Sequence, residues 1–135
     1  MNISTAQLSS TARTFFEKYG EDFDAAKWPA FAAHYCEPAF SVRADGSVTV
    51  LDTRASVGEF FSRVWSTWRQ EGYVRFAFSN LSVTSIGNQS MLVTLTWHLL
   101  NEEGTEIRQW NQSYQLLSVS DSWRVLSSTF HRAPV

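Results

Sequence analysis

The sequence predicts an α+β fold in which three N-terminal helices pack on a curved antiparallel sheet of four long strands, with a short hairpin before the third helix. Apolar residues recur at helical spacing as far as Trp68, and from Tyr73 onward they recur with a period of two. Breaks rich in Gly, Asn and Ser then divide the second part into four segments. We expect one domain over residues 1–135, because this length is typical of a single domain and no linker or repeat interrupts it.

Three segments combine an apolar stripe with the end signals of an amphipathic helix. The first follows a capping box at Ser4–Gln7 and is expected to end near Gly20. The second carries Pro29 in its first turn, where the missing N–H leaves no hydrogen bond unmade. The third is expected to use Asp52 or Thr53 as its N-cap.

Local turn chemistry predicts the hairpin and one irregularity in the sheet. Asp45-Gly46 separates two short apolar stretches and supplies the positive φ angles of a tight hairpin turn. Along the first long strand the apolar positions change phase at Ser79-Asn80. One extra residue there predicts a β-bulge, which would bend the sheet.

The turn at residues 101–105 sets which strand residues face the helices. It resembles a type I turn closed by a left-handed glycine, and it pairs Trp97 with Gln109. In this register Gln109, Asn111 and Ser113 face the helices. Buried amides and hydroxyls need partners or water, so these residues predict the polar wall of a wet pocket. If the register is shifted by one residue, they face solvent instead.

The opposite face of the sheet then carries two large aromatic side chains. Trp110 and Tyr114 lie on it together with Thr96, and charged or basic residues stand only at its margin. Association surfaces are enriched in aromatic residues. We therefore expect a homodimer that forms through this outer face, with Thr96, Trp110 and Tyr114 in the contact.

Composition and charge exclude several classes of partner. The net charge is −2, with both signs interspersed, so no basic stripe is available for nucleic acid. Cys36 is the only cysteine, which fits a reducing compartment. The N-terminus has no signal-peptide pattern, and no apolar run reaches the length of a membrane span. We expect a cytoplasmic protein that binds neither nucleic acid nor membrane.

Motifs for common cofactors are absent from the sequence. It contains no P-loop, no G-x-G-x-x-G and no G-x-S-x-G, and its three histidines do not have metal-ligand spacing. The stretches 73–100, 107–119 and 123–132, which form most of the predicted long strands, contain no Asp or Glu. An acid would therefore have to come from helices or loops, for example Asp22, Asp24 or Glu37, which are more typical of caps and solvated charges. We expect no cofactor and no metal.

The order of these elements resembles the NTF2-like superfamily, which includes SnoaL-like cyclases and ketosteroid isomerases. The matching stretches are Tyr35–Phe40 leading to the Asp45-Gly46 hairpin, and Ser122–Leu126 near the C-terminus. The resemblance implies a cone-shaped fold with a pocket between the sheet and the helices, and a dimer through the convex face. It does not imply one activity, because this fold hosts isomerases, dehydratases, cyclases and non-catalytic binding modules.

Two catalytic carboxylates of the ketosteroid isomerases have no counterpart in this sequence. The position of the isomerase general base falls on Arg43 or Ala44, and that of the second carboxylic acid falls near Ser113 or Gln115. The tyrosine of the first helix has a counterpart in Tyr19. The same resemblance turns the strand face that ends at His131 toward the mouth of the cone, which makes His131 the candidate general base.

Three hypotheses remain open from the sequence. In the first, the cavity binds a small, largely apolar ligand. Its expected binding residues are the apolar wall of Trp28, Tyr35 and Trp97, the polar groups Gln109, Asn111 and Ser113, and Arg43, which could hold an anionic group. In the second, His131 takes a proton and Tyr19 stabilises the developing oxyanion of an isomerase, dehydratase or cyclase. In the third, the protein is a dimeric interaction module that works through its outer face.

Overall fold

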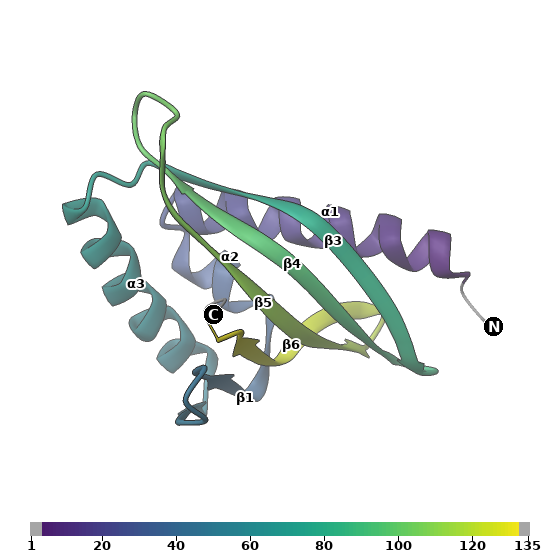
Figure 1. The fold of residues 1–135 in the computed structure, drawn as a ribbon. Coiled ribbons are helices and arrows are strands. Elements are labelled where there is room, and N and C mark those ends of the chain that lie inside the picture. Colours follow the sequence, from purple (N-terminus) through teal and green to yellow (C-terminus); the bar gives the residue numbers. More distant parts are fainter. Residues whose placement is uncertain (1–3, 133–135) are drawn as a thin grey trace.

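Helices and strands follow one another in the predicted order in the computed structural model, which describes residues 4–132. Figure 1 shows the three helices on one side of a strongly curved sheet. The predicted α+β fold is thus confirmed. The elements are α1 (Thr5–Asp24), α2 (Trp28–Ala32), β1 (Tyr35–Val42), β2 (Val48–Leu51), α3 (Arg54–Gln70), β3 (Arg75–Gly87), β4 (Ser90–Leu100), β5 (Glu106–Val119) and β6 (Ser122–Phe130).

The sheet is mixed, whereas a purely antiparallel sheet was expected. Its strand order is β2-β1-β6-β5-β4-β3, so the hairpin β1–β2 extends the four-stranded meander and the sheet has six strands. Strand β1 pairs in parallel with β6, with Ser41 beside Ser128. The backbone N–H of Val125 also donates to the carbonyl of His34 just before β1, at 2.7 Å. Because β2 occupies only one edge of β1, the C-terminal strand satisfies the other edge.

The ends of α1 and α3 can be compared with the helix ends predicted from the sequence. Ser4 and Gln7 form the predicted capping box of α1. The helix does not end near Gly20, because Phe23 is buried in the core and holds one more turn, and the chain leaves the helix at Ala26, which has φ +56°. Thr53 is the N-cap of α3, and its side chain accepts from the backbone of Ser56.

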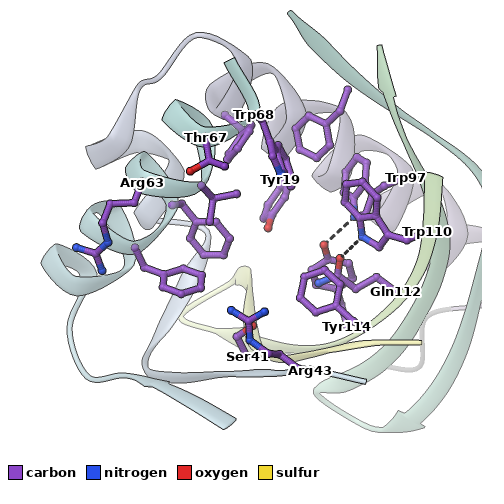
Figure 2. A pocket seen from close by; sticks show the side chains of 16 residues that line it. Tyr19, Ser41, Arg43, Arg63, Thr67, Trp68, Trp97, Trp110, Gln112 and Tyr114 are labelled. Carbon is purple, nitrogen blue, oxygen red and sulfur yellow. Dashed lines mark hydrogen bonds between the residues drawn. The ribbon is translucent and has the colours of Figure 1, made fainter. Parts of the chain in front are cut away.

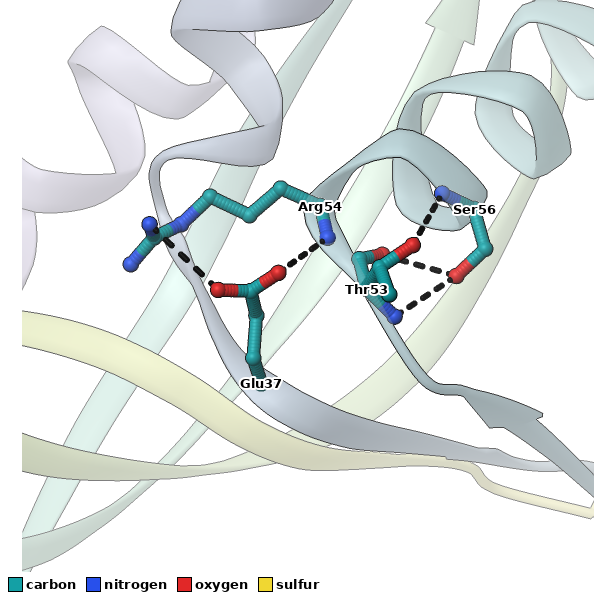
Figure 3. A network of polar contacts seen from close by, with 4 residues as sticks. All are labelled: Glu37, Thr53, Arg54 and Ser56. Carbon is teal, nitrogen blue, oxygen red and sulfur yellow. Dashed lines mark hydrogen bonds and ion pairs between the residues drawn. The ribbon is translucent and has the colours of Figure 1, made fainter.

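A polar contact ties the start of α3 to β1. The Glu37 carboxylate accepts from the backbone N–H of Arg54 at 2.8 Å and lies 3.6 Å from its guanidinium (Figure 3). A carboxylate at this place also complements the partial positive charge of the helix N-terminus. The contact ties the N-terminus of α3 to the first half of β1, at the end of the β1–β2 hairpin away from its turn.

Bulges in the sheet decide which side chains face the helices, and one of them was predicted. The predicted bulge in β3 is confirmed, because Ser79 pairs with Thr96 and Ser82 with Thr94, with Asn80 at φ +56° between them. The turn after β4 also forms as expected, with the N–H of Asn101 bonded to the carbonyl of residue 105.

The register expected for β5 was wrong by one residue. Leu100 pairs with Glu106 but Leu99 pairs with Arg108, so Ile107 is an extra residue and Trp97 pairs with Trp110 rather than with Gln109. A shift of one residue exchanges the two faces of a strand. The inward side chains of β5 are therefore Trp110, Gln112, Tyr114 and Leu116, and the outward ones are Gln109, Asn111 and Ser113.

A similar bulge exchanges the inner and outer faces of the C-terminal strand β6 relative to the expectation. Leu116 pairs with Val125 but Gln115 pairs with Ser127, which leaves one extra residue on β6. Ser128 and Phe130 consequently share the inner face, and His131 lies on the outer face. There the His131 imidazole is 2.7 Å from the Ser113 hydroxyl.

The core between the helices and the inner sheet face is built mostly from aromatic rings. Many neighbouring rings meet edge to face, for example Phe16 with Trp97 at a centroid distance of 6.0 Å and Phe31 with Phe61 at 5.0 Å. The packing is dense around α1 and becomes looser toward α3, whose aromatic residues are only half-buried.

The helices within residues 4–132 include none that is both long and apolar enough to cross a lipid bilayer.

Candidate functional site

A cavity of about 470 Å³ lies between α1, α3 and the inner face of the sheet (Figure 2). Ten of its sixteen lining residues are aromatic. Helix α1 contributes Tyr19 and Phe23, and α3 contributes residues from 60 to 68 at helical spacing. The sheet contributes Trp97 from β4 and the inward residues of β5. The size and the apolar wall are typical of a small-molecule site.

Tyrosine hydroxyls form a buried cluster at the bottom of the cavity. The hydroxyls of Tyr19 and Tyr35 are 2.6 Å apart, and the Trp97 indole N–H donates to the Tyr114 hydroxyl oxygen at 2.8 Å. Burial is the main cause that raises the pKa of Tyr19, Tyr35 and Tyr114 well above the usual value, and the neighbouring tyrosines add to it. These phenols therefore stay protonated at neutral pH, and each hydroxyl can both donate and accept a hydrogen bond, as the Tyr114 oxygen does in accepting from Trp97.

Gln112 adds a buried amide to the cavity wall. Its side chain is 5% exposed, and its Oε1 accepts from the Trp110 indole N–H at 3.0 Å. This contact fixes the orientation of the amide, because the indole can only donate. Among residues 4–132 no acceptor is found for the Gln112 NH₂ group, which leaves it available to a ligand.

The polar end of the cavity is formed by the exit of β1. Ser41 is buried and lies on the inner face, and Arg43 follows it on the same side of the chain. Ser41 pairs with Ser128, which in turn pairs with Tyr114, so one row of hydroxyls crosses the sheet. Figure 2 shows the Arg43 guanidinium above Ser41, directed toward the interior of the cavity.

Charge in the cavity lining is positive. Arg43 and Arg63 are its only charged residues, and neither forms an ion pair within residues 4–132. Among the described residues 4–132, the lining includes no histidine and no carboxylate. The groups that surround the cavity can bind a ligand and donate hydrogen bonds to it, but no lining side chain is suited to accept a proton at neutral pH.

The structure brings together three of the predicted site residues. Tyr19, Trp97 and Arg43 all line the cavity. Tyr35 lies behind Tyr19 and contacts it through its hydroxyl. Trp28 instead lines a shallow hollow between α2 and α3. The binding roles of these residues stay predictions.

The other predicted site residues lie outside the cavity. Gln109, Asn111 and Ser113 face away from the helices because of the bulge at Ile107, and Ser113 bonds to Thr94 across the outer face at 2.8 Å. His131 is exposed beside Ser113 and is not brought to Tyr19. The placement of these four residues in a pocket was therefore wrong.

The expected outer face was wrong for two of its three residues. Trp110 and Tyr114 point inward and line the cavity, and only Thr96 lies on the outer face. Sequence reasoning consequently missed Gln112 and Tyr114 as site residues. The signal that could have found them is the shared phase of Trp110, Tyr114 and Leu116, which are the bulkiest residues of that strand.

The outer face carries a separate chain of polar contacts. The Ser79 hydroxyl is 2.6 Å from His98 Nε2, and His98 Nδ1 contacts the Glu106 carboxylate. These three residues hold β3, β4 and β5 together at the outer face and lie outside the cavity. Within residues 4–132 no three His, Cys, Asp or Glu side chains are grouped so that they could hold a metal ion.

Comparison with known proteins identifies the same fold. Residues 9–133 match the model of a family described as NTF2-like protein (DUF6841). The structure is similar to that of Aln2 from a Streptomyces species, with 15% identity and a TM-score of 0.78 over 97% of this chain and 94% of that one. No curated protein matches the sequence.

Two further solved structures are similar over most of the chain. A domain of unknown function with a cystatin-like fold from Nostoc punctiforme has 20% identity and a TM-score of 0.74, over 98% of this chain and 81% of that one. An NTF2-like protein with a cystatin-like fold from Novosphingobium aromaticivorans has 13% identity and a TM-score of 0.70, over 95% of this chain and 89% of that one. At these identities the similarity establishes the fold alone.

Proposed function

The chain belongs to the NTF2-like protein family, and we propose that it binds a small, largely apolar molecule in the cavity between its helices and its sheet. The observation that carries this proposal is an aromatic cavity of about 470 Å³ whose few polar groups converge at one end. Apolar surface that leaves water contributes roughly 25 cal/mol per Å² to binding, and fixed polar groups orient the ligand. The oriented amide of Gln112 and the protonated phenols of Tyr19 and Tyr114 supply such groups.

Filling the cavity with a side chain is expected to abolish ligand binding. Val64 is half-buried on the cavity wall, so Val64→Trp places an indole in the space that a ligand would occupy. We expect the neutral apolar probe N-phenyl-1-naphthylamine to bind the parent protein with saturation, and Val64→Trp to weaken that binding roughly 10-fold or more. The measurement is a titration of probe fluorescence.

The matched control places the same indole elsewhere. Val50 is 52% exposed on β2 and is not part of the cavity, so Val50→Trp should bind the probe as the parent does. Equal binding by the parent and Val64→Trp would show that the probe occupies another place, and the proposal would then fail.

A second proposal concerns the outer face, where two copies of the chain are proposed to pair. In the middle of this face the outward residues of the central strands are uncharged: Leu92, Thr94 and Thr96 on β4, and Asn111, Ser113 and Gln115 on β5, whereas His98 and Glu106 lie toward one end. Around a two-fold axis such a face meets itself without like-charge repulsion, and interface centres are depleted of charge. This observation supports a homodimer whose contact includes Thr96 but not Trp110 or Tyr114.

A charge in the middle of this face is expected to separate the copies. Thr96→Arg would place two guanidinium groups near each other at the centre of a symmetric contact. We expect sedimentation equilibrium to give a dimer for the parent and a monomer for Thr96→Arg. Thr105→Arg adds the same charge at the exposed turn after β4 and should leave the dimer intact. A parent protein that sediments as a monomer would contradict the proposal.

A further inference from the structure

We propose that the ligand of the cavity is a hydrophobic carboxylate whose anionic group is bound by Arg43, an inference that rests on the proposed ligand-binding function. The apolar body of the ligand would lie among the aromatic rings. Its carboxylate would face the polar end of the cavity, where Arg43, Ser41 and Gln112 are found. The inference names the chemical class of the ligand and the residue that selects it.

The first argument is the charge of the cavity lining. Among residues 4–132, the charged side chains that line the cavity are those of Arg43 and Arg63, neither of which forms an ion pair, and no carboxylate is among them. The lining is therefore positive, which favours an anion over a neutral or cationic ligand.

The second argument is the direction of the two arginine side chains. Figure 2 shows the Arg43 guanidinium directed into the cavity, whereas Arg63 extends from α3 away from its centre. Arg43 stands at the point where β1 leads into the hairpin, and its backbone N–H bonds to the carbonyl of Ser47 at 2.9 Å. The backbone that carries Arg43 is thus held by the hairpin, and Arg63 adds only positive potential at the rim.

The third argument is that a neighbouring polar group can donate to an anion. The Gln112 side chain lines the cavity, its Oε1 accepts from the Trp110 indole, and no acceptor for its NH₂ group is found among residues 4–132. The Tyr114 hydroxyl, whose oxygen accepts from Trp97, also keeps its proton, because burial raises its pKa. Donors of this kind complement an acceptor-only group such as a carboxylate. The planar guanidinium of Arg43 can bind the two carboxylate oxygens side by side. A single inward guanidinium also matches one negative charge better than the two charges of a phosphate monoester.

Two probes of the same size separate charge from shape. At pH 7.5, 2-naphthoate is an anion and 2-naphthamide is neutral, and both fit a cavity of about 470 Å³. Isothermal titration calorimetry should show that the parent protein binds 2-naphthoate roughly 10-fold or more tightly than 2-naphthamide, because a hydrogen-bonded charge pair is lost with the amide. The preference should decrease as salt is added, since Arg43 is exposed at the cavity mouth.

Substitution of Arg43 tests the residue itself. In Arg43→Gln the affinity for 2-naphthoate should fall about 10-fold, whereas that for 2-naphthamide should not change. Arg63→Gln should reduce naphthoate binding by a smaller factor, and Arg13→Gln, which removes a charge from α1 outside the cavity, should have no effect. Thermal denaturation checks that each variant is folded.

The outcomes distinguish this inference from the function on which it rests. If both probes bind with equal affinity and Arg43→Gln changes neither, the cavity binds apolar ligands but the carboxylate inference is wrong. If neither these probes nor the neutral naphthylamine probe binds the parent protein, the ligand-binding function is wrong as well. Selective loss of naphthoate binding in Arg43→Gln would support both.

Discussion

Replacement of Phe16 by alanine is expected to lower the free energy of unfolding by about 3–5 kcal/mol, which is typical of a buried phenylalanine. Phe16 is fully buried on α1, and its ring lies against Tyr19, Trp97 and Tyr114 at centroid distances of 5.4, 6.0 and 4.7 Å. These neighbours are held by the hydrogen bond between Trp97 and Tyr114 and so are poorly able to move into the space that the ring leaves. Urea denaturation followed by fluorescence measures the change.

The adjacent phenylalanine provides a matched control for this substitution. Phe15 is only half-buried and packs against the surface of the core. Phe15→Ala should therefore lower the free energy of unfolding by roughly half as much as Phe16→Ala or less, since Phe15 buries less apolar surface. If the two variants lose the same stability, the inward orientation of Phe16 would be wrong.

The second large effect is a pH dependence of stability that arises from Asp24. Burial raises the pKa of the Asp24 carboxyl from 3.8 to about 6, although Tyr73, the Phe76 N–H and nearby arginines oppose the shift. Its Oδ1 accepts from the Tyr73 hydroxyl, and from the Phe76 N–H at 3.2 Å. Between pH 4 and pH 6 the folded protein binds more protons than the unfolded chain. The stability contributed by this group is thus present at low pH and is lost as the pH rises through about 6.

The variant Asp24→Asn should remove this dependence. Asparagine keeps an oxygen that can accept from Tyr73 and Phe76, but it carries no charge at any pH. We expect Asp24→Asn to be more stable than the parent at pH 8, with a difference that shrinks toward pH 4. Guanidinium denaturation at several pH values measures this difference. A parent protein that gains stability over Asp24→Asn as the pH rises from 4 to 8 would contradict the assigned shift.

Asp45 offers a control with the opposite sign. Hydrogen bonds from the Ser47 backbone and hydroxyl lower the pKa of the Asp45 carboxyl. The stability that this group contributes is present at neutral pH and is lost as the pH falls through its lowered pKa. Asp45→Asn should consequently be less stable than the parent at pH 7, and its deficit should decrease in acid.

Much of the fold could be predicted from the sequence because its signals are local. The capping box at Ser4–Gln7, the Asp45-Gly46 turn and the phase change at Ser79-Asn80 each depend on a few neighbouring residues. The parallel pairing of β1 with β6 joins distant parts of the chain, and no local pattern specifies it.

The candidate site was predicted less well because it depends on strand register. In β5 the expected register was counted from the turn at residues 101–105, which paired Leu99 with Ile107 and gave Ile107 the same phase as Gln109 and Asn111. The structure makes Ile107 the extra residue of a bulge, and the phase of Trp110 and Tyr114 then decides which side is buried. One inserted residue exchanges the faces, so the sequence analysis placed Tyr19, Trp97 and Arg43 at the cavity but missed Gln112.

The parallel pairing of β1 with β6 also has a consequence for the order of folding. Helix α1 and the β3–β4–β5 meander can form from contacts between neighbouring segments, but the β1–β6 ladder requires a long loop to close first. Closing this loop costs chain entropy before any hydrogen bond of the ladder can form. Contacts between residues far apart in the sequence are therefore expected to form late. Ser41 and Arg43 reach the cavity only through β1, and Phe130 only through β6. We therefore expect the polar end of the cavity to be assembled last, after most of its aromatic wall is in place.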